Sequence, residues 1–237
     1  NIERINTIRK HLSLARGGFL AQYAFPAQAV SLIFSDVPGN RLEFVASGPT
    51  VRDTTTVENA RKLIREYGLD KRFGPSAIEL VETPKEARYF ERVSNVLLVS
   101  NKTALEGMSA KARELGFAPK IVTETMTGEA SQAGFRIINE LHQAPPKTAL
   151  LYGGETTVTM GGSGKGGRNQ ELAISALRFV RCKEVLAAAT SDGKDNTEFA
   201  GALCDIMAKK RAEKLGLNIE EYLSNNNSYN FFKKAGD

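Results

Sequence analysis

Strand-like and helix-like segments alternate along residues 96–141, which read VLLVSNKTALEGMSAKARELGFAPKIVTETMTGEASQAGFRIINEL. The apolar run over 96–100 predicts a strand, and the segment over 103–115, which Gly116 ends, predicts a helix. A predicted strand over 120–123 and a predicted helix over 129–141 follow. Almost continuously apolar strands that alternate with helices are typical of an α/β fold with a largely parallel sheet.

The same alternation extends upstream of this stretch. Apolar residues recur at helical spacing over 2–12, so we expect the chain to open on an amphipathic helix. The run over 30–34 predicts a buried strand that leads into a turn, and residues 42–46 are a second candidate strand. A helix is expected over 57–67, with Gly68 as its stop.

Downstream, the alternation continues to the last third of the chain. Strands are expected over 149–152, 156–160 and 185–189, and helices over 169–180 and 202–215. The Pro145-Pro146 pair breaks the chain between two of these elements. It is the best candidate boundary, and it predicts one domain over residues 1–145 and a second over 146–237.

The composition excludes several classes of protein. The chain has 237 residues, and 32 Lys and Arg against 27 Asp and Glu give a formal net charge of +5. No run of about 18 apolar residues is present, so we expect no membrane span. The basic residues are scattered among acidic ones, which is typical of a solvated surface, and we expect no nucleic-acid partner.

The cysteines and histidines indicate neither a metal centre nor a hydrolase triad. Cys182 and Cys204 lack metal-ligand or redox spacing, and both are interpreted as small buried side chains of a cytoplasmic protein. His11 is interpreted as a helix-surface or capping residue and His142 as structural. The first residue is Asn1 rather than Met, so we expect the chain to start after processing, cutting or disorder.

Three polar turns follow predicted strands, and each carries a carboxylate. These are Asp36 in the turn 35–39, Glu155 in the turn 153–157 and Asp192 in the turn 190–195. Ligands of α/β sheets bind beyond the carboxyl ends of the strands, so we expect these side chains to converge on one acidic site. Such a site could bind Mg²⁺ or accept a proton from a substrate hydroxyl.

Residues 161–171 contain the densest cluster of glycines, and they lead directly into a predicted helix. The N–H groups and the dipole at a helix start favour an anion, and Lys165 and Arg168 add positive charge there, so this segment predicts phosphate binding. A mobile surface hairpin is the alternative interpretation. The G-x-G-x-x-G match at 162–167 follows a Thr-rich strand and lacks a ribose-binding acid, and Gly166 stands where a Walker A loop needs Ser or Thr.

The sequence resembles the MOFRL-type (DUF4147) glycerate 2-kinases over almost its whole length. The most specific resemblance is the Gly153-Gly154-Glu155-Thr-Thr segment together with the block Gly-Gly-Arg168-Asn169-Gln170-Glu171. Shorter segments agree with the family in the same order: 5–13, 17–18, 35–39, 47–50, 101–102, 191–193 and 200–202. The resemblance implies a larger Rossmann-like domain with a mostly parallel sheet, followed by a smaller α/β MOFRL-type domain, with the site in a cleft.

The family's activity implies roles for the candidate residues. Members transfer a phosphoryl group from ATP to D-glycerate with Mg²⁺ and give 2-phosphoglycerate. On this basis Arg168 is expected on the phosphoryl group or the glycerate carboxylate, and Asp192 and Asp36 divide the roles of metal ligand and base in an order left open. Glu155 is expected to support the metal, and Arg9, Lys10 and His11 are candidates for lining the cleft. The residues expected to bind ATP are Gly153, Gly154, Lys165, Gly166, Gly167 and Asn169.

The chain also departs from the family pattern. Members are longer at both ends: they carry a Gly-rich Ser-Ala turn and a catalytic lysine upstream, and a Thr/Gly-rich loop downstream. We therefore expect this chain to be the central and C-terminal part of a kinase. The alternatives are a hydroxypyruvate reductase-type oxidoreductase and a non-catalytic nucleotide- or anion-binding fragment, and a homodimer is left open.

Overall fold

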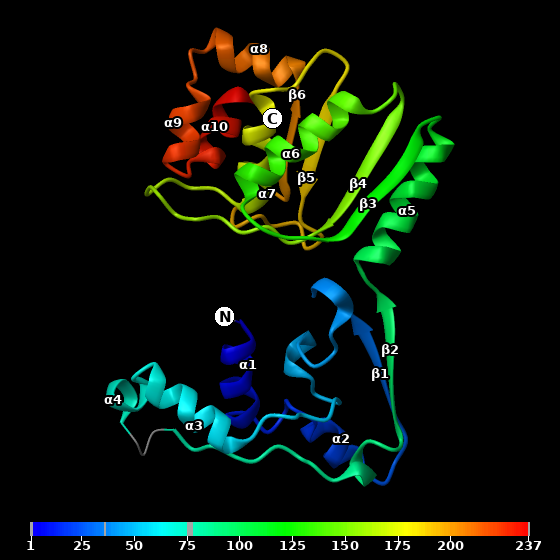
Figure 1. Ribbon diagram of the computed structural model, residues 1–237, viewed down its shortest axis with the longest axis vertical. Coiled ribbons are helices and arrows are strands. Elements are labelled where there is room, and N and C mark those ends of the chain that lie inside the picture. The colour runs from blue at the N-terminus through cyan, green and yellow to red at the C-terminus, as the bar shows by residue number, and fades with distance from the viewer. Residues whose placement is uncertain (1, 36, 75–77, 237) are drawn as a thin grey trace. The chain divides into compact units, whose positions relative to one another are not determined.

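The computed structural model describes residues 2–35, 37–74 and 78–236. The chain divides into two compact units, unit 1 over Asn1–Glu106 and unit 2 over Gly107–Asp237 (Figure 1). Helices and strands alternate in both units, so the α/β prediction is confirmed. Among the described helices, none has the length and apolar character needed to cross a lipid bilayer.

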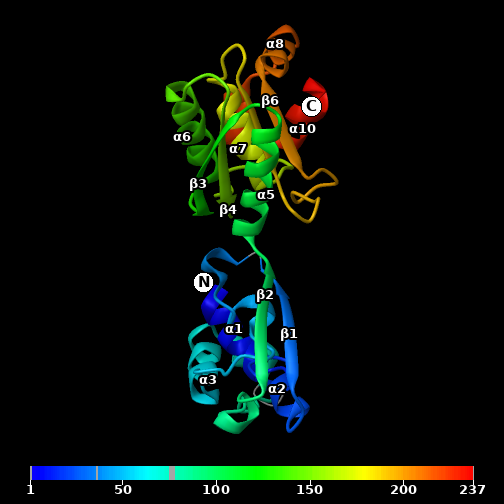
Figure 2. The same ribbon diagram turned by 90° about the vertical axis from the view of Figure 1, so that its right-hand side faces the viewer.

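Unit 1 contains one pair of parallel strands, which run side by side in Figure 2. The register starts at Ala29 against Val93 and shifts at a bulge between Ile33 and Phe34. The helix over Val57–Glu66 begins where predicted, because Thr56 and Asn59 form a reciprocal capping box. The elements are α1 (Ile2–His11), α2 (Phe19–Ala24), β1 (Ala29–Phe34), α3 (Val57–Glu66), α4 (Leu69–Phe73) and β2 (Val93–Val99), and α5 (Asn101–Glu114) crosses the division.

The strand β1 is exposed, although its apolar run predicted a buried strand. Val30, Leu32 and Phe34 lie on one face, and they are 59%, 60% and 67% exposed. The other face is more covered, with Ile33 buried. The prediction was wrong on this point because an apolar run fixes the secondary structure but not what packs against it. The candidate strand over 42–46 is also wrong, since Val45–Ser47 forms a 3₁₀ turn with Ala46 at φ +49°.

The helix α1 buries its polar side. Lys10 and His11 are 5% and 0% exposed, whereas Ile2 and Ile5 are about half exposed. Lys10 Nζ lies 3.1 Å from Asp53 Oδ1, and His11 Nδ1 donates to the main-chain oxygen of Val81 at 2.9 Å. His11 is therefore a buried, hydrogen-bonded residue, which corrects its interpretation as a helix-surface or capping residue.

Unit 2 is built around α7, which is buried on all sides over residues 170–177. Gly134 of α6 allows the two helices to approach closely, because a Cβ there would lie 2.2 Å from the main-chain oxygen of Leu172. The helices α8, α9 and α10 lie together beside α7 (Figure 1), and Phe231 of α10 completes the core. The elements are β3 (Ala118–Met126), α6 (Ala130–Gln143), β4 (Thr148–Gly154), α7 (Arg168–Leu177), β5 (Val185–Ala189), β6 (Gly201–Asp205), α8 (Ile206–Lys214), α9 (Ile219–Ser224) and α10 (Ser228–Ala235).

The strands of unit 2 pair in two different ways. The pair β3–β4 is parallel, as predicted, whereas β5–β6 is antiparallel. Residues 202–205 were predicted to be helical, but they belong to β6, and the helix begins only after Asp205, which caps the N–H groups of Met207 and Ala208. The strand predicted over 156–160 is reduced to a single bridge between Glu129 and Thr157.

The predicted domain boundary at residues 145/146 falls inside unit 2, between α6 and β4. The division between the two compact units falls at residues 106/107. Residues 107–145 associate with the rest of unit 2 because β3 pairs with β4 and α6 packs on α7.

Candidate functional site

The candidate site lies at the start of α7, beside the turns that follow β4 and β5. Arg168 is the first residue of α7, and its guanidinium pairs with the carboxylate of Glu155, directly after β4. The Arg168 side chain is 43% exposed, so it can contact a ligand while it holds Glu155. The structure thus brings together two of the predicted residues, which flank residues 156–167 in the chain.

Asp192, in the turn after β5, lies within electrostatic reach of Arg168. The Thr190 side chain, the Lys194 N–H group and the positive charge of Arg168 lower the pKa of the Asp192 carboxyl below its usual value. The carboxyl is exposed and therefore ionised at neutral pH. Glu155 and Arg168 are thus paired at this edge of unit 2, and the charge of Arg168 also acts on Asp192.

Asp195 occupies the N-terminus of α7. Its carboxylate accepts hydrogen bonds from the N–H groups of Asn169 and Gln170, at 3.2 and 2.8 Å, and from Asn169 Nδ2 at 3.1 Å. Asp195 is 2% exposed. The positive end of the helix, which the sequence predicted as an anion site, thus already binds a carboxylate of the protein.

Gly167 is a glycine because Asp195 lies so close to it. A Cβ on Gly167 would be 2.0 Å from the main-chain oxygen of Asp195 and 2.4 Å from its Oδ2. Gly154, at the end of β4, has φ +137°, and a Cβ there would lie 2.2 Å from Met126 N. Close backbone packing therefore accounts for both glycines, and Gly153 is the residue before Gly154 in β4.

The glycine-rich loop, residues 161–167, is bound along its length by the Asn turn, residues Asn225–Asn227 between α9 and α10. Gly161 N and Gly162 N donate to Asn226 Oδ1 at 2.7 and 3.0 Å. The next three N–H groups of the loop donate to Asn225 Oδ1, Asn225 O and Asn227 Oδ1. Five consecutive N–H groups, from Gly161 to Lys165, thus point into the protein. The loop is not a mobile hairpin in this structure.

Lys165 and Arg168 have different partners. Lys165 Nζ lies 3.5 Å from Glu198 Oε2 and 4.0 Å from the centre of the Tyr229 ring. The main-chain oxygen of Gly166 accepts a hydrogen bond from Asn196 Nδ2 at 2.9 Å. The two cations that the sequence predicted at one phosphate thus belong to neighbouring but separate ion pairs.

Glu155 and Asp192 were predicted as metal ligands, and they could supply two carboxylates to a divalent cation. Magnesium in kinases is usually held by one or two carboxylates together with substrate phosphates and water. Within the described parts of the chain, no cluster of three or more His, Cys, Asp or Glu side chains could hold a metal by itself. Two carboxylates are the type and number of protein ligands that such a magnesium ion takes, and one of them, Glu155, already pairs with Arg168. Asp36, the third predicted carboxylate, lies outside the described residues.

The other predicted residues lie in unit 1. Lys10 and His11 are bound in the Asp53 network and present no charge to solvent. Burial raises the pKa of Asp53, but the hydrogen bonds from Thr55 and the charge of Lys10 lower it overall. Arg9 is exposed, and its Nη1 lies 3.4 Å from Asn6 Oδ1.

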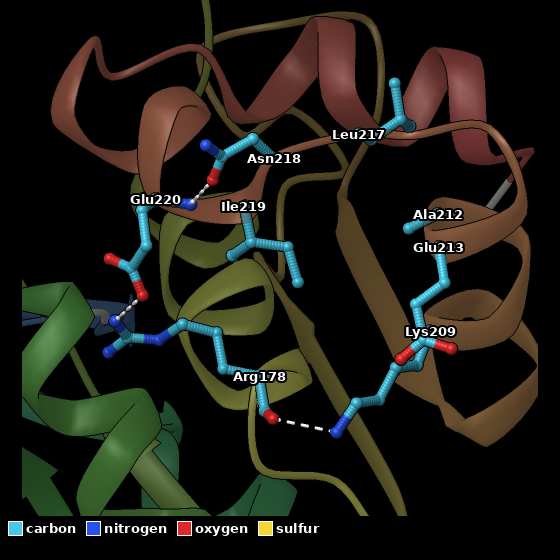
Figure 3. A pocket seen from close by; sticks show the side chains of 8 residues that line it. All are labelled: Arg178, Lys209, Ala212, Glu213, Leu217, Asn218, Ile219 and Glu220. Carbon is cyan, nitrogen blue, oxygen red and sulfur yellow. Dashed lines mark hydrogen bonds and ion pairs between the residues drawn. The ribbon is translucent and has the colours of Figure 1, made fainter.

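A hollow of about 290 Å³ at the other end of α7 is a weaker candidate (Figure 3). Lys209 Nζ donates to the main-chain oxygen of Arg178 at 2.8 Å, and the Arg178 guanidinium pairs with Glu220. Asn218 caps the N–H group of Glu220. These groups satisfy one another, as the dashed lines in Figure 3 show, so the hollow is a packing feature of α7, α8 and α9.

Sequence reasoning missed Asp195 and Asn226 as residues that organise the site. Asp195 belongs to the turn 190–195, in which Asp192 was the predicted site residue, and no role was predicted for Asn226. A signal existed for Asp195, because a carboxylate is a common partner of a helix N-terminus. It could not be used, because Asp195 lies 25 residues after Gln170, one of the helix residues that it caps.

Two family models match the chain. The first, described as a domain of unknown function (DUF4147), covers residues 1–82, and the second, described as the MOFRL family, covers residues 148–237. Glu155, Arg168, Asp192 and Asp195 all lie within the second match.

Several similar proteins are named glycerate kinases, and one from Agrobacterium vitis, 37% identical over 100% of this chain and 57% of that protein, is named a putative hydroxypyruvate reductase. The D-glycerate 2-kinase of Thermotoga maritima is 39% identical over 246 residues, which cover 100% of this chain and 58% of that protein. The glycerate kinase of Macaca fascicularis is 32% identical, over 98% of this chain and 72% of that protein. The crystal structure of the glycerate kinase from T. maritima matches with a TM-score of 0.84 and 40% identity, over 100% of this chain and 59% of that one. This chain thus spans a little under three fifths of the T. maritima relative, and it belongs to the DUF4147/MOFRL family of glycerate kinases.

Proposed function

We propose that the protein acts in phosphoryl transfer from ATP to D-glycerate, giving 2-phosphoglycerate. The observation that supports this most directly is the group at the start of α7, where an exposed guanidinium pairs with Glu155 beside the ionised Asp192. Phosphoryl transfer depends mainly on positioning and on stabilisation of charge by cations. A half-exposed arginine held by a carboxylate suits both requirements.

Arg168 contacts the transferring phosphoryl group or the glycerate carboxylate in this proposal. Its planar guanidinium can donate two parallel hydrogen bonds to either group. Asp192 acts as the base that receives the proton of the glycerate hydroxyl, or it holds the metal with Glu155, and Asp36 takes the other role. The hydroxyl oxygen forms the new bond to the γ-phosphorus, and the bond from that phosphorus to the ADP oxygen breaks.

In this proposal, the ATP phosphates bind mainly to side chains and less to the backbone of the glycine-rich loop. The N–H groups of Gly161 to Lys165 already donate to the Asn turn. The side chains of Lys165 and Arg168 are therefore the groups proposed to bind the phosphates. Gly153, Gly154, Gly166, Gly167 and Asn169 shape the wall of the nucleotide site. Magnesium, when bound at Glu155 and Asp192, would neutralise charge on the phosphates. We also propose that the protein works in the cytoplasm.

A coupled assay with the full-length protein, ATP and D-glycerate tests the proposal. Formation of ADP without consumption of NADH or NADPH supports the kinase. Reduction of hydroxypyruvate with consumption of the dinucleotide, and no ADP, would instead support the reductase alternative. Calorimetry with Mg-ATP tests the third alternative, because binding without turnover would make the protein a nucleotide-binding module.

A further inference from the structure

The side chain of Asn226 connects the glycine-rich loop to α7. Its Oδ1 accepts hydrogen bonds from Gly161 N and Gly162 N, and its Nδ2 donates to Glu171 Oε2 at 3.1 Å and to the main-chain oxygen of Thr159 at 3.3 Å. Asn226 is 6% exposed, so these partners replace water. All the hydrogen bonds of this amide are thus used between two segments that lie more than 50 residues before it in the chain.

The backbone of Asn226 also restricts which residue can stand there. Its φ is +50°, a left-handed conformation that Asn and Asp tolerate far better than other residues with a side chain. The loop in turn is shaped to fit the turn. A Cβ on Gly162 would lie 2.2 Å from Asn225 Oδ1, and a Cβ on Gly164 would lie 2.4 Å from Asn225 O. The glycines and the Asn turn are therefore complementary surfaces.

The far end of the contact is Glu171, one turn into α7. Burial raises the pKa of the Glu171 carboxyl, the hydrogen bond from Asn226 lowers it, and the negative charge of Glu129 raises it further. A groove of about 520 Å³ borders this contact, and its other charged lining groups are Arg178 and Glu220, which pair with each other. Glu171 thus depends on the amide of Asn226 for its polar partner.

We propose that Asn226 is a positioning residue, which fixes the glycine-rich loop against α7 and thereby sets the position of Arg168. The loop ends at Gly167, so a shift of its backbone moves the first residue of α7 directly. The effect on catalysis rests on the proposed function of Arg168. The effect on the loop does not, and it can be measured separately.

The contact between Asn226 and Glu171 can be tested by exchanging the hydrogen-bond donor and acceptor between the two side chains. In Asn226→Asp the carboxylate can still accept from Gly161 N and Gly162 N, but its second oxygen faces Glu171 Oε2. In the double variant Asn226→Asp with Glu171→Gln, the new amide at position 171 can donate to the new carboxylate at position 226. The hydrogen bond between residues 171 and 226 is then restored with donor and acceptor reversed, whereas the bond from residue 226 to the main-chain oxygen of Thr159 is lost in both variants.

Hydrogen exchange of the amides of Gly161 to Lys165 is the first measurement, made on the full-length protein. Near neutral pH we expect their protection factors to fall at least about tenfold in Asn226→Asp and to recover in part in the double variant, which still lacks the bond to the main-chain oxygen of Thr159. Asn139→Asp, an amide whose Nδ2 donates within α6, is the matched control and should leave the loop unchanged. Amides of α6 provide the internal reference for global stability.

The second measurement is the pH dependence of kcat. In Asn226→Asp, the carboxyl groups of residues 226 and 171 share a proton while the loop is bound to the Asn turn, which we call the closed form. When the loop is released, in the open form, both carboxyl groups have ordinary pKa values and share no proton. The closed form is therefore favoured at mildly acidic pH and lost as pH rises. We expect kcat near neutral pH to fall about 10²-fold, with a smaller change in KM, and the double variant to recover part of the loss and to remove the pH dependence.

Two outcomes would overturn the proposal. The first is normal protection of the loop amides in Asn226→Asp, and the second is a double variant whose protection is no better than that of the single variant. If protection follows the exchange of polarity but no variant alters kinase turnover, the contact is real and the role of Arg168 in the proposed function is wrong. If the wild-type protein has no kinase activity, hydrogen exchange still decides whether Asn226 holds the loop.

Discussion

Replacement of Arg168 by lysine separates the chemical role of its guanidinium from its charge. Both side chains carry one positive charge, so the ion pair with Glu155 can persist in Arg168→Lys. That pair is exposed to solvent, and pairs of this kind contribute about 0–1 kcal/mol to stability. We therefore expect the melting temperature to stay close to that of the wild-type protein.

The expected loss of activity follows from the hydrogen bonds that lysine cannot make. A guanidinium can donate two parallel hydrogen bonds to a phosphoryl group or a carboxylate, whereas an ammonium acts as a point charge. One hydrogen bond to a charged group is worth about 1.5–3 kcal/mol. We expect kcat to fall by at least about 10²-fold, which corresponds to about 2.7 kcal/mol of transition-state stabilisation.

The assay couples ADP formation to a spectroscopic signal, with ATP and D-glycerate varied independently in the full-length protein. Arg178→Lys is the matched control, because Arg178 lies at the other end of α7 and also pairs with a glutamate, Glu220. Its kcat should stay within about twofold of wild type. A kcat for Arg168→Lys that is also within about twofold would show that Arg168 does not touch the reacting groups.

Three further substitutions test the site and its support. Asp192→Asn should lower kcat as severely as Arg168→Lys while circular dichroism stays unchanged; a mild effect would shift the base or metal role to Asp36. Asp195→Ala should lower the free energy of unfolding by about 2–3 kcal/mol in chemical denaturation, because it leaves buried N–H groups of α7 without a partner, and an unchanged midpoint would contradict this. Gly134→Ala should destabilise by at least about 2 kcal/mol, since its Cβ would meet the α7 backbone. Its control Gly107→Ala, in a helix with open space around it, should stabilise by about 0.5–1 kcal/mol, and equal effects of the two would refute the packing argument.

Local patterns predicted most helices and strands, because their causes are local. The apolar runs and glycine stops placed β3, α5 and α6 within a few residues of their observed bounds. The failures occurred where a partner distant in the chain decides the outcome. Ala202 and Leu203 are good helix formers, but residues 202–205 pair with β5 and become a strand. The polar residues of α1 are buried because Asp53 lies beneath them, and no spacing within 2–12 carries that information.

The pairing of Glu155 with Arg168 was predictable from the position of Glu155 directly after a strand of the parallel pair β3–β4. Asp192 follows β5, which belongs to a separate antiparallel pair, and its link to Arg168 is the effect of the guanidinium charge on its pKa. The sequence could not reveal which group accepts the hydrogen bonds of the first N–H groups of α7. Asp195 reaches α7 only because the turn after β5 folds back over Gly167, and that path depends on the tertiary structure.

The glycine-rich loop shows why a motif needs the direction of its N–H groups before it can be interpreted. Glycine permits two things that a sequence cannot distinguish: N–H groups that open onto a phosphate, and a backbone that packs against another backbone. Here the second applies from Gly161 to Lys165, because the Asn turn accepts those hydrogen bonds and fills the space where a Cβ would stand on Gly162 and Gly164. The loop therefore adds rigidity rather than donors, and the cations for a phosphate must come from side chains at its end. Arg168 follows the loop directly and keeps its guanidinium exposed. A rigid loop of this kind is therefore suited to position the Arg168 side chain.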